Sequence, residues 1–187
     1  MKTTIITDKD YQTELFQKLQ ERLVAFFKDK NFEIEAINVG RDDLAYCMGC
    51  FGCWVKKPGE CVIDDLMTKI NRDYMNSDIV IYLSPIIFGQ FSANIKNAID
   101  RSLPNTSLPF FITRPDGSTI HPPRYDKYPQ PIIIGYGEQL DTEDRQLFID
   151  ITEKHRKNIP ALIYQNDDQA LIDALNTIAL GKVGEHQ

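Results

Sequence analysis

The residues of this chain best suited to chemistry are four cysteines gathered in one short stretch. The first three follow one another at two-residue spacing and seven residues precede the last; they are Cys47, Cys50, Cys53 and Cys61. Two-residue spacing lets neighbouring thiolates converge on one centre, while Gly49 and Gly52 let the backbone turn tightly and direct N–H groups toward sulfur. A set of this kind can hold a [4Fe–4S] cluster.

Three other interpretations of these cysteines stay open. Zinc sites made of four cysteines more often use two separated pairs, so the spacing fits zinc less well. Four reduced thiols without metal are about as compatible with the sequence as a cluster is, and a disulfide is a minor option. The confinement of all four to residues 47–61 is not how a disulfide framework spreads over a secreted domain.

A second group of candidate residues follows an apolar run at residues 79–83. Small and polar residues at the carboxyl end of a strand let the backbone approach a flat ligand, and Phe88 could pack against an aromatic ring. Alternatively, Phe88 and Phe91 simply cover the end of the sheet. Glycines that end a later apolar run permit close backbone approach at the same edge. The candidate ligand-binding residues are Ser84, Pro85, Ile86, Ile87, Phe88, Gly89, Gly135, Tyr136 and Gly137.

The segment TDKDYQT at residues 7–13 is unusual for its expected position after the first strand. In a doubly wound fold, this loop receives a phosphate on a helix N-terminus. The segment has no glycine, and its carboxylates repel phosphate unless they turn away. We therefore expect Asp8 and Asp10 to be helix-capping acids on a solvated turn. The hydroxyls of Thr7 and Thr13 are the candidate cofactor ligands here.

The elements that must position these residues alternate along the chain. Apolar or β-branched runs predict strands at 2–7, 32–36, 79–83, 131–136 and 161–164. Helical spacing and capping residues predict helices at 12–28, after Asp64, after Ser92, from Asp141, and over 171–178 with a stop near Gly181. This alternation predicts an α/β fold, a three-layer doubly wound five-stranded parallel sheet that binds ligands beyond the carboxyl ends of its strands.

A proline-rich stretch at residues 104–130 interrupts the alternation. Within it, two short apolar segments flank Pro115-Asp-Gly, which predicts a small hairpin insertion around 109–121. The stretch is either a surface excursion or a lid or subunit contact beside the ligand edge. The loops expected at that edge are 8–11, 40–63, 84–91 and 136–141.

Length and charge limit the classes of protein that fit. The 187 residues suit one domain spanning 1–187. The 21 Lys and Arg against 27 Asp and Glu give a net charge of −6, which argues against nucleic-acid binding. No segment approaches the roughly 20 apolar residues of a membrane helix, and the N-terminus has too short an apolar stretch for a secretory signal. We therefore expect a cytoplasmic protein that binds neither membrane nor nucleic acid.

Three motifs in order give the chain a family resemblance. CMGCFGCWVKKPGECVIDDL, then SPIIFGQFSANIKNAIDR, then RYDKYP before a strand ending in glycine, resemble the flavodoxin-like NAD(P)H-dependent FMN reductases, and among them the iron–sulfur flavoproteins. The resemblance covers residues 30–140. It departs from the family in the first loop, which usually reads GSPRxxSNT, and at Ile87, where tyrosine is common.

The resemblance implies a fold, cofactors and partners. It implies strand order 2-1-3-4-5, FMN at the carboxyl edge, and a homodimer or homotetramer. Residues 84–89 would then flank the isoalloxazine ring, residues 135–137 would lie near its other side, and the four cysteines match the cluster motif. Thr13 matches the last threonine of the family's first loop.

The implied activity is that of an FMN-dependent NAD(P)H oxidoreductase. Hydride would pass from NAD(P)H to the flavin, and electrons would leave to a quinone, another small electrophile or a protein, with a cluster exchanging single electrons with the flavin. No catalytic acid or base is expected, because the cofactor carries the chemistry. The alternatives are a degenerate flavodoxin-like protein without FMN, acting as a thiol or cluster sensor or as an assembly subunit, and a zinc-stabilised binding module.

Overall fold

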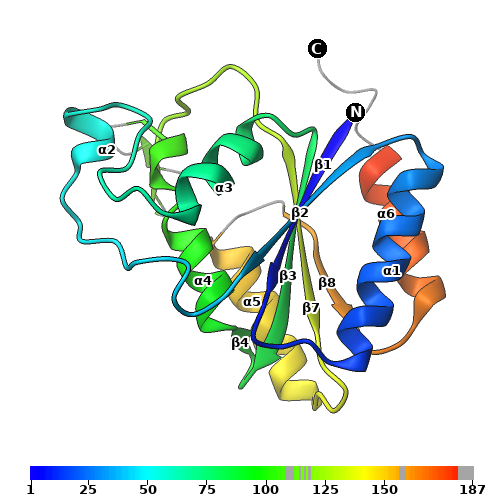
Figure 1. Ribbon diagram of the computed structural model, residues 1–187. Coiled ribbons are helices and arrows are strands. Elements are labelled where there is room, and N and C mark those ends of the chain that lie inside the picture. The colour runs from blue at the N-terminus through cyan, green and yellow to red at the C-terminus, as the bar shows by residue number, and fades with distance from the viewer. Residues whose placement is uncertain (108–111, 114, 116, 118, 156–158, 181–187) are drawn as a thin grey trace.

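The central feature of the computed structural model is a parallel β-sheet, which Figure 1 shows between two layers of helices. The structure describes residues 1–107, 112–113, 115, 117, 119–155 and 159–180. Five parallel strands lie in the order β2-β1-β3-β7-β8, which is the predicted order 2-1-3-4-5. Their bounds are β1 Lys2–Asp8, β2 Glu33–Val39, β3 Ile79–Ile87, β7 Gln130–Tyr136 and β8 Ala161–Tyr164.

Helices cover both faces of this sheet, which is why the central strands read as continuous apolar runs. Helices α1 and α6 pack on one face and α3, α4 and α5 on the other, as Figure 1 shows. The middle strand β3 is buried along its whole length except at its last residue. The helix bounds are α1 Glu14–Asp29, α3 Leu66–Met75, α4 Ala93–Asp100, α5 Thr142–His155 and α6 Asp168–Leu180.

Side-chain caps fix where these helices begin. Thr13 caps α1 by accepting a hydrogen bond from the Phe16 amide, and Ser92 caps α4 as predicted. The cap of α3 is Asp65 and not the expected Asp64, because the Asp65 carboxylate accepts from the Met67 amide at the second helical position. The predicted stop at Gly181 lies outside the described residues.

Three short elements were not foreseen from the sequence. They are the one-turn helix α2 at Gly52–Val55, the strand β4 at Gln90–Phe91 and the 3₁₀ turn η1 at Leu103–Asn105. β3 runs four residues beyond its expected end, because its last residues fold back antiparallel onto β4 in a small hairpin. This hairpin shapes the carboxyl edge of the sheet.

The hairpin insertion expected around 109–121 is present in the part of it that the structure describes. β5 (Ile112–Thr113) pairs antiparallel with β6 (Thr119–Ile120). Residues 109–111, 114, 116 and 118 lie outside the described residues. Among the helices of the described chain, none is long and apolar enough to cross a membrane.

Candidate functional site

A strained two-residue turn joins β3 to β4 at the carboxyl edge of the sheet. Both of its residues have positive φ, 50° at Phe88 and 69° at Gly89, which is the geometry of a tight two-residue hairpin turn. Phe88 is 88% exposed although it is a large aromatic side chain. A bulky residue in this backbone region costs about 1–2 kcal/mol, and such strain concentrates at functional sites.

Glycine is required at the second position of this turn for a further reason. A Cβ built on Gly89 would lie 2.7 Å from Leu147 Cδ2 and 2.9 Å from Leu147 Cβ, so α5 packs directly on the backbone. The turn is therefore held from below by α5 while Phe88 faces away from the core. An exposed aromatic on a rigid support can cover the flat face of a ligand ring.

The rest of the predicted segment, residues 84–87, is directed largely into the protein. The buried Ser84 hydroxyl donates to the Pro85 carbonyl at 2.9 Å and accepts from the Ser92 amide at 3.0 Å. Pro85 and Ile86 are buried, and Ile87 is half-buried. Ser84 thus fixes the start of α4, and a ligand at this edge would meet mainly the backbone, Ile87 and Phe88.

The second predicted segment, at the end of β7, lies beside the first. Ser84 pairs with Gly135 and Pro85 with Tyr136 in the parallel register. Gly135 has no room for a side chain, since an added Cβ would lie 2.6 Å from Phe148 Cε1. The sheet therefore brings the two predicted ring-binding segments together at one edge.

Tyr136 links this edge to the first loop, which we define as residues 8–13. Its buried hydroxyl donates to the Tyr11 carbonyl at 3.0 Å. Burial, followed by the charges of Asp8 and Tyr11, raises the pKa of Tyr136 well above its usual value of 10.0. The hydroxyl therefore stays protonated and holds the loop from within.

Contrary to the prediction from the sequence, Asp8 and Asp10 of the first loop do not cap a helix on a solvated turn. Asp8 is fully buried, because β1 continues to this residue, and Thr13 rather than an acid caps α1. Asp8 Oδ1 accepts from the Asp10 amide at 2.9 Å and from Asn94 Nδ2 at 3.0 Å. Asp10 is exposed, and its Oδ2 accepts from the same Asn94 nitrogen at 2.9 Å. One neutral amide therefore holds two carboxylates.

The two threonines predicted to bind cofactor differ in their surroundings. Thr7 is buried within β1 and donates to Asn38 Oδ1 at 2.5 Å. Thr13 is exposed and its hydroxyl oxygen accepts from the Phe16 amide at 3.2 Å. Of the two residues, only Thr13 is exposed, so a ligand could reach only Thr13. Its cofactor role remains a prediction.

Side chains on one face of α4 form hydrogen bonds with both the first loop and the cysteine loop. We define the cysteine loop as residues 44–65. Asn94, Asn97 and Arg101 lie at positions i, i+3 and i+7 and so share a face. Asn97 Nδ2 donates to the Leu44 carbonyl at 3.3 Å and to the Ala45 carbonyl at 3.4 Å. Asn94 serves the first loop instead, so neighbouring residues of one helix hold two different loops.

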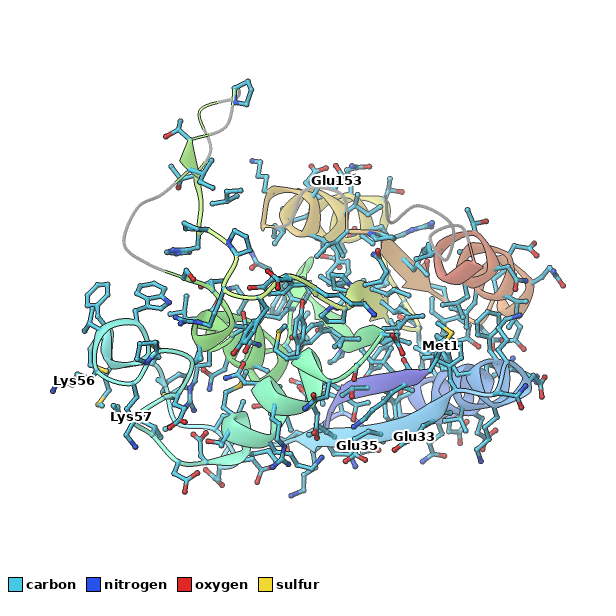
Figure 2. The ribbon with its side chains drawn as sticks, turned by 90° about the horizontal axis from the view of Figure 1, so that it is seen from above. Met1, Glu33, Glu35, Lys56, Lys57 and Glu153 are labelled. Atoms are coloured by element: carbon cyan, nitrogen blue, oxygen red, sulfur yellow. The ribbon has the colours of Figure 1, made fainter. Side chains whose placement is uncertain are left out.

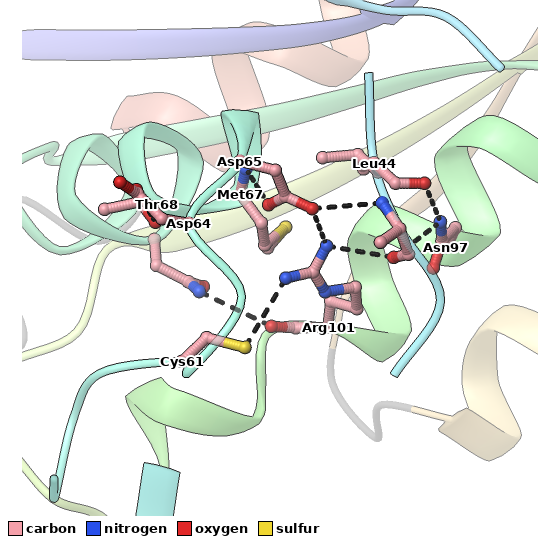
Figure 3. A network of polar contacts seen from close by, with 10 residues as sticks. Leu44, Cys61, Asp64, Asp65, Met67, Thr68, Asn97 and Arg101 are labelled. Carbon is pink, nitrogen blue, oxygen red and sulfur yellow. Dashed lines mark hydrogen bonds and ion pairs between the residues drawn. The ribbon is translucent and has the colours of Figure 1, made fainter. Parts of the chain in front are cut away.

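Arg101, directly after α4, is the centre of the network in Figure 3. It is buried, with 3% of its surface exposed. Its Nη1 donates to the Ala45 carbonyl at 2.9 Å and pairs with the Asp65 carboxylate, while Nη2 donates to Cys61 Sγ at 3.5 Å. Burial alone would lower the pKa of Arg101, but Asp65 and Cys61 raise it above the usual value. A fixed cation therefore faces the fourth cysteine.

The four cysteines are free thiols gathered in one region but not closed around a centre. Cys47 and Cys50 are exposed, while Cys53 and Cys61 are half-buried. Burial and the neighbouring charge of Cys61, with smaller contributions from Cys47 and Cys50, raise the pKa of Cys53 above its usual value of 9.0. Within the residues that the structure describes, no group of three or more side chains is arranged to hold a metal ion.

The cysteine loop does not stay at the carboxyl edge, where the sequence analysis placed it. Figure 1 shows it leaving β2 and running beside α4 to α2, and Figure 2 shows Lys56 and Lys57 at its outer end, away from Glu33 and Glu35 on β2. Arg101 and Asn94 are seven residues apart, which is about 10 Å along a helix axis. The thiol that contacts Arg101 therefore lies at the far end of α4 from the first loop.

The cysteine loop also contains the contacts of Trp54 and borders a cavity. Trp54 in α2 donates from Nε1 to the Leu103 carbonyl at 3.0 Å, and its ring lies 4.7 Å from that of His121. A cavity of about 780 Å³ is bordered by Cys61, by Arg72 of α3 and by Tyr125, which lies between β6 and β7. The fourth cysteine is thus accessible from this cavity.

Sequence reasoning missed the polar face of α4. The predictions for this part of the sequence concerned Ser84–Gly89 and a helix that begins after Ser92. The available signal was the i, i+3, i+7 spacing of Asn94, Asn97 and Arg101 on a helix next to two candidate loops. What this spacing could not show is which loop each side chain contacts.

Comparisons with known proteins agree with this architecture. A family model described as NADPH-dependent FMN reductase matches residues 9–110. An iron-sulfur flavoprotein from Archaeoglobus fulgidus is 32% identical over 103 residues, which are 55% of this chain and 46% of that protein. The chain spans about half the length of the curated relatives it matches.

Solved structures with little sequence identity share the fold. The NAD(P)H:quinone oxidoreductase from Methanothermobacter marburgensis has a TM-score of 0.63 at 10% identity, covering 100% of this chain and 98% of that one. A flavoenzyme described as NAD(P)H:(acceptor) oxidoreductase from Paracoccus denitrificans has a TM-score of 0.57 at 15% identity, covering 97% and 98%.

Proposed function

This chain belongs to the NADPH-dependent FMN reductase family, and we propose that it is a flavin-dependent oxidoreductase that takes electrons from NAD(P)H. The observation that carries the proposal is the β3–β4 turn. It presents the exposed Phe88 on a strained, well-supported backbone beside the end of β7, at the edge where open α/β sheets bind ligands.

The residues at this edge fit the ring system of a flavin. A flat ring needs close approach of backbone and an apolar wall, which residues 87–89 and Gly137 provide. When bound there, the flavin supplies hydride and electron transfer. The protein's part is to orient the ring, to cover one face with Phe88 and to exclude water, so we assign no side chain as acid or base.

The cysteine loop is the proposed site of a [4Fe–4S] cluster held by Cys47, Cys50, Cys53 and Cys61. The donor set fits, because the other three thiols lie close enough to Cys53 to influence it electrostatically and Arg101 offers a hydrogen bond to Cys61. Since two of the thiols are exposed, cluster binding would have to draw that part of the loop inward. A cluster in this position supplies one-electron chemistry.

The partners of the reaction follow from the family and are part of the proposal. The acceptor is a quinone, another small electrophile or an electron-transfer protein, and the donor is NADH or NADPH. We propose a homodimer or homotetramer that works in the cytoplasm. The relatives named above as iron-sulfur flavoprotein and quinone oxidoreductase support this assignment.

The proposal is tested by anaerobic purification followed by a visible spectrum and by assays of flavin, iron, sulfide and zinc. Bound flavin, or NAD(P)H oxidation that depends on added flavin, is expected. Phe88→Ala should weaken flavin binding about tenfold, as expected for loss of an aromatic contact. Phe51→Ala is the matched control for flavin affinity, because Phe51 is also an exposed phenylalanine at positive φ, 56°, but lies in the cysteine loop.

A protein that contains no flavin, binds neither FMN nor riboflavin when they are added, and oxidises no NAD(P)H would exclude the oxidoreductase. Iron and sulfide in such a protein would then favour a cluster or thiol sensor, whereas stoichiometric zinc would favour a zinc-stabilised binding module.

A further inference from the structure

The first loop presents negative charge where a doubly wound fold usually accepts a phosphate. Asp8 lies at the end of β1 with none of its surface exposed, and Asp10 follows on the surface. In the described part of the chain, no cation pairs with Asp8, and its Oδ2 has no hydrogen-bond donor. Carboxylates at this position repel an approaching anion, and solvent and salt screen that repulsion less at a buried position than at an exposed one.

Several donors that could attract a phosphate are directed at other groups of the protein. Lys9, the one cation of the loop, lies 3.8 Å from Asp43, and Gln12 Nε2 donates inward to the Asp8 carbonyl at 2.7 Å. The Tyr136 hydroxyl donates to the Tyr11 carbonyl. Asn94, whose amide reaches both carboxylates, is likewise directed at Asp8 and Asp10.

The surroundings of the α1 N-terminus add to the negative charge. A cavity of about 320 Å³ beside it is bordered by Glu14 and Glu138, and Lys18 is the cation at its wall. Lys18 Nζ donates to Asn166 Oδ1 at 2.6 Å and lies 3.5 Å from Asp168. The helix N-terminus, which would favour an anion, thus has two carboxylates beside it, and the nearby cation is paired with another acid.

The two halves of the edge therefore favour different parts of a flavin. The β3–β4 turn offers an exposed aromatic and backbone to an uncharged ring, whereas the first loop opposes a group that carries about −1.5 to −2 charge at neutral pH. On the basis of the proposed function, we propose that this protein recognises the uncharged part of a flavin and disfavours its 5′-phosphate, with Asp8 and Asp10 as the residues that set this preference. Riboflavin then binds at least as tightly as FMN.

The test is a set of titrations of the full-length protein, freed of flavin, with lumiflavin, riboflavin and FMN. At low ionic strength, riboflavin is expected to bind about threefold to tenfold more tightly than FMN, and added salt should narrow the difference because it screens the carboxylates. Affinity for FMN that exceeds affinity for riboflavin at low ionic strength would overturn the inference while leaving the proposed oxidoreductase intact. Failure of all three ligands to bind would overturn both.

Variants of the two acids assign the effect. Asp8→Asn with Asp10→Asn should tighten FMN about tenfold and change riboflavin by less than about twofold, because only FMN carries the repelled charge. Asp10→Asn alone, at an exposed position, should give about a threefold change and keeps the test valid if the buried substitution impairs folding. Asp29→Asn, an exposed acid at the other end of α1, is the matched control. Equal tightening of riboflavin and FMN in the acid variants would contradict the inference.

Discussion

At the first turn of α4, the amide of Asn94 holds two carboxylates of the first loop, whereas at its end the guanidinium of Arg101 holds a carboxylate and a thiol of the cysteine loop. The same helix face thus supports two loops with opposite electrostatics. The neutral anchor leaves the first loop negative, and the cationic anchor compensates the charge of Asp65 and of any thiolate at Cys61. The charge of each site therefore depends on a side chain outside the loop that forms it.

The largest effect is expected from removing the cationic anchor. Arg101→Gln should lower the free energy of unfolding by about 3 kcal/mol, because it breaks a buried ion pair and leaves Asp65 without its partner. Urea unfolding at pH 7 measures this loss. Arg72→Gln is the control, since its side chain is 66% exposed in an ion pair of 3.6 Å and should cost less than about 0.5 kcal/mol. Similar losses in both variants would show that Arg101 is not a distinctive anchor.

Removing the neutral anchor should have a smaller effect. Asn94→Leu keeps the size of the side chain but deprives Asp8 and Asp10 of a shared donor, which should cost about 2 kcal/mol. The same unfolding experiment applies, and adding Asp8→Asn should restore part of the loss, since a neutral amide is less costly to leave unpaired. A double variant that is less stable than Asn94→Leu would contradict this account.

The carboxylate of Asp65, which pairs with Arg101, should make the free energy of unfolding depend on pH in the acid range. Burial raises the pKa of Asp65, but hydrogen bonds from Arg101, Ala45 and Met67 outweigh it and hold the pKa below the usual 3.8. A lowered pKa in the folded state stabilises the protein above pH 3.8, and this contribution is lost as pH falls through the lowered value. The free energy of unfolding, measured from pH 6 to 2, should fall less steeply in Asp65→Asn, with a difference of about 1 kcal/mol.

The middle residue of the face should matter least. Asn97→Ala loses two long hydrogen bonds, 3.3 and 3.4 Å, to uncharged carbonyls, and should cost about 0.5–1 kcal/mol in urea unfolding. A loss as large as that of Arg101→Gln would show that the anchoring does not depend on charge.

The sheet could be predicted from the sequence because its evidence is local. Apolar runs such as 79–83 and 131–136 mark strands buried on both faces, and their alternation with helices predicts a parallel sheet. The strand order itself was implied by the family resemblance. The β3–β4 hairpin was missed because it has only two residue pairs, Ile86 with Phe91 and Ile87 with Gln90, which are too few to give a periodic pattern in the sequence. A local sequence pattern does not reveal a strand pairing as short as this one.

The candidate site was predictable only in part, because its remaining features depend on contacts between distant segments. Asp8 looked like a helix-capping acid, yet the pairing of β1 with β2 continues through Asp8 and Val39 and buries it. Arg101 contacts Cys61 across 40 residues of sequence, and Asn94 contacts Asp8 across 86. Residue types and spacing identified the cysteines, but not the helix that anchors their loop.

Trp54 gives the cysteine loop its own optical signal. It is the single tryptophan of the chain, and it lies one residue after the third cysteine, with its indole N–H bonded to the Leu103 carbonyl and its ring against His121. Indole fluorescence from the native protein therefore originates entirely beside the thiols. A change in emission on adding iron, oxidant or an acceptor would report rearrangement of that loop in real time, without any label.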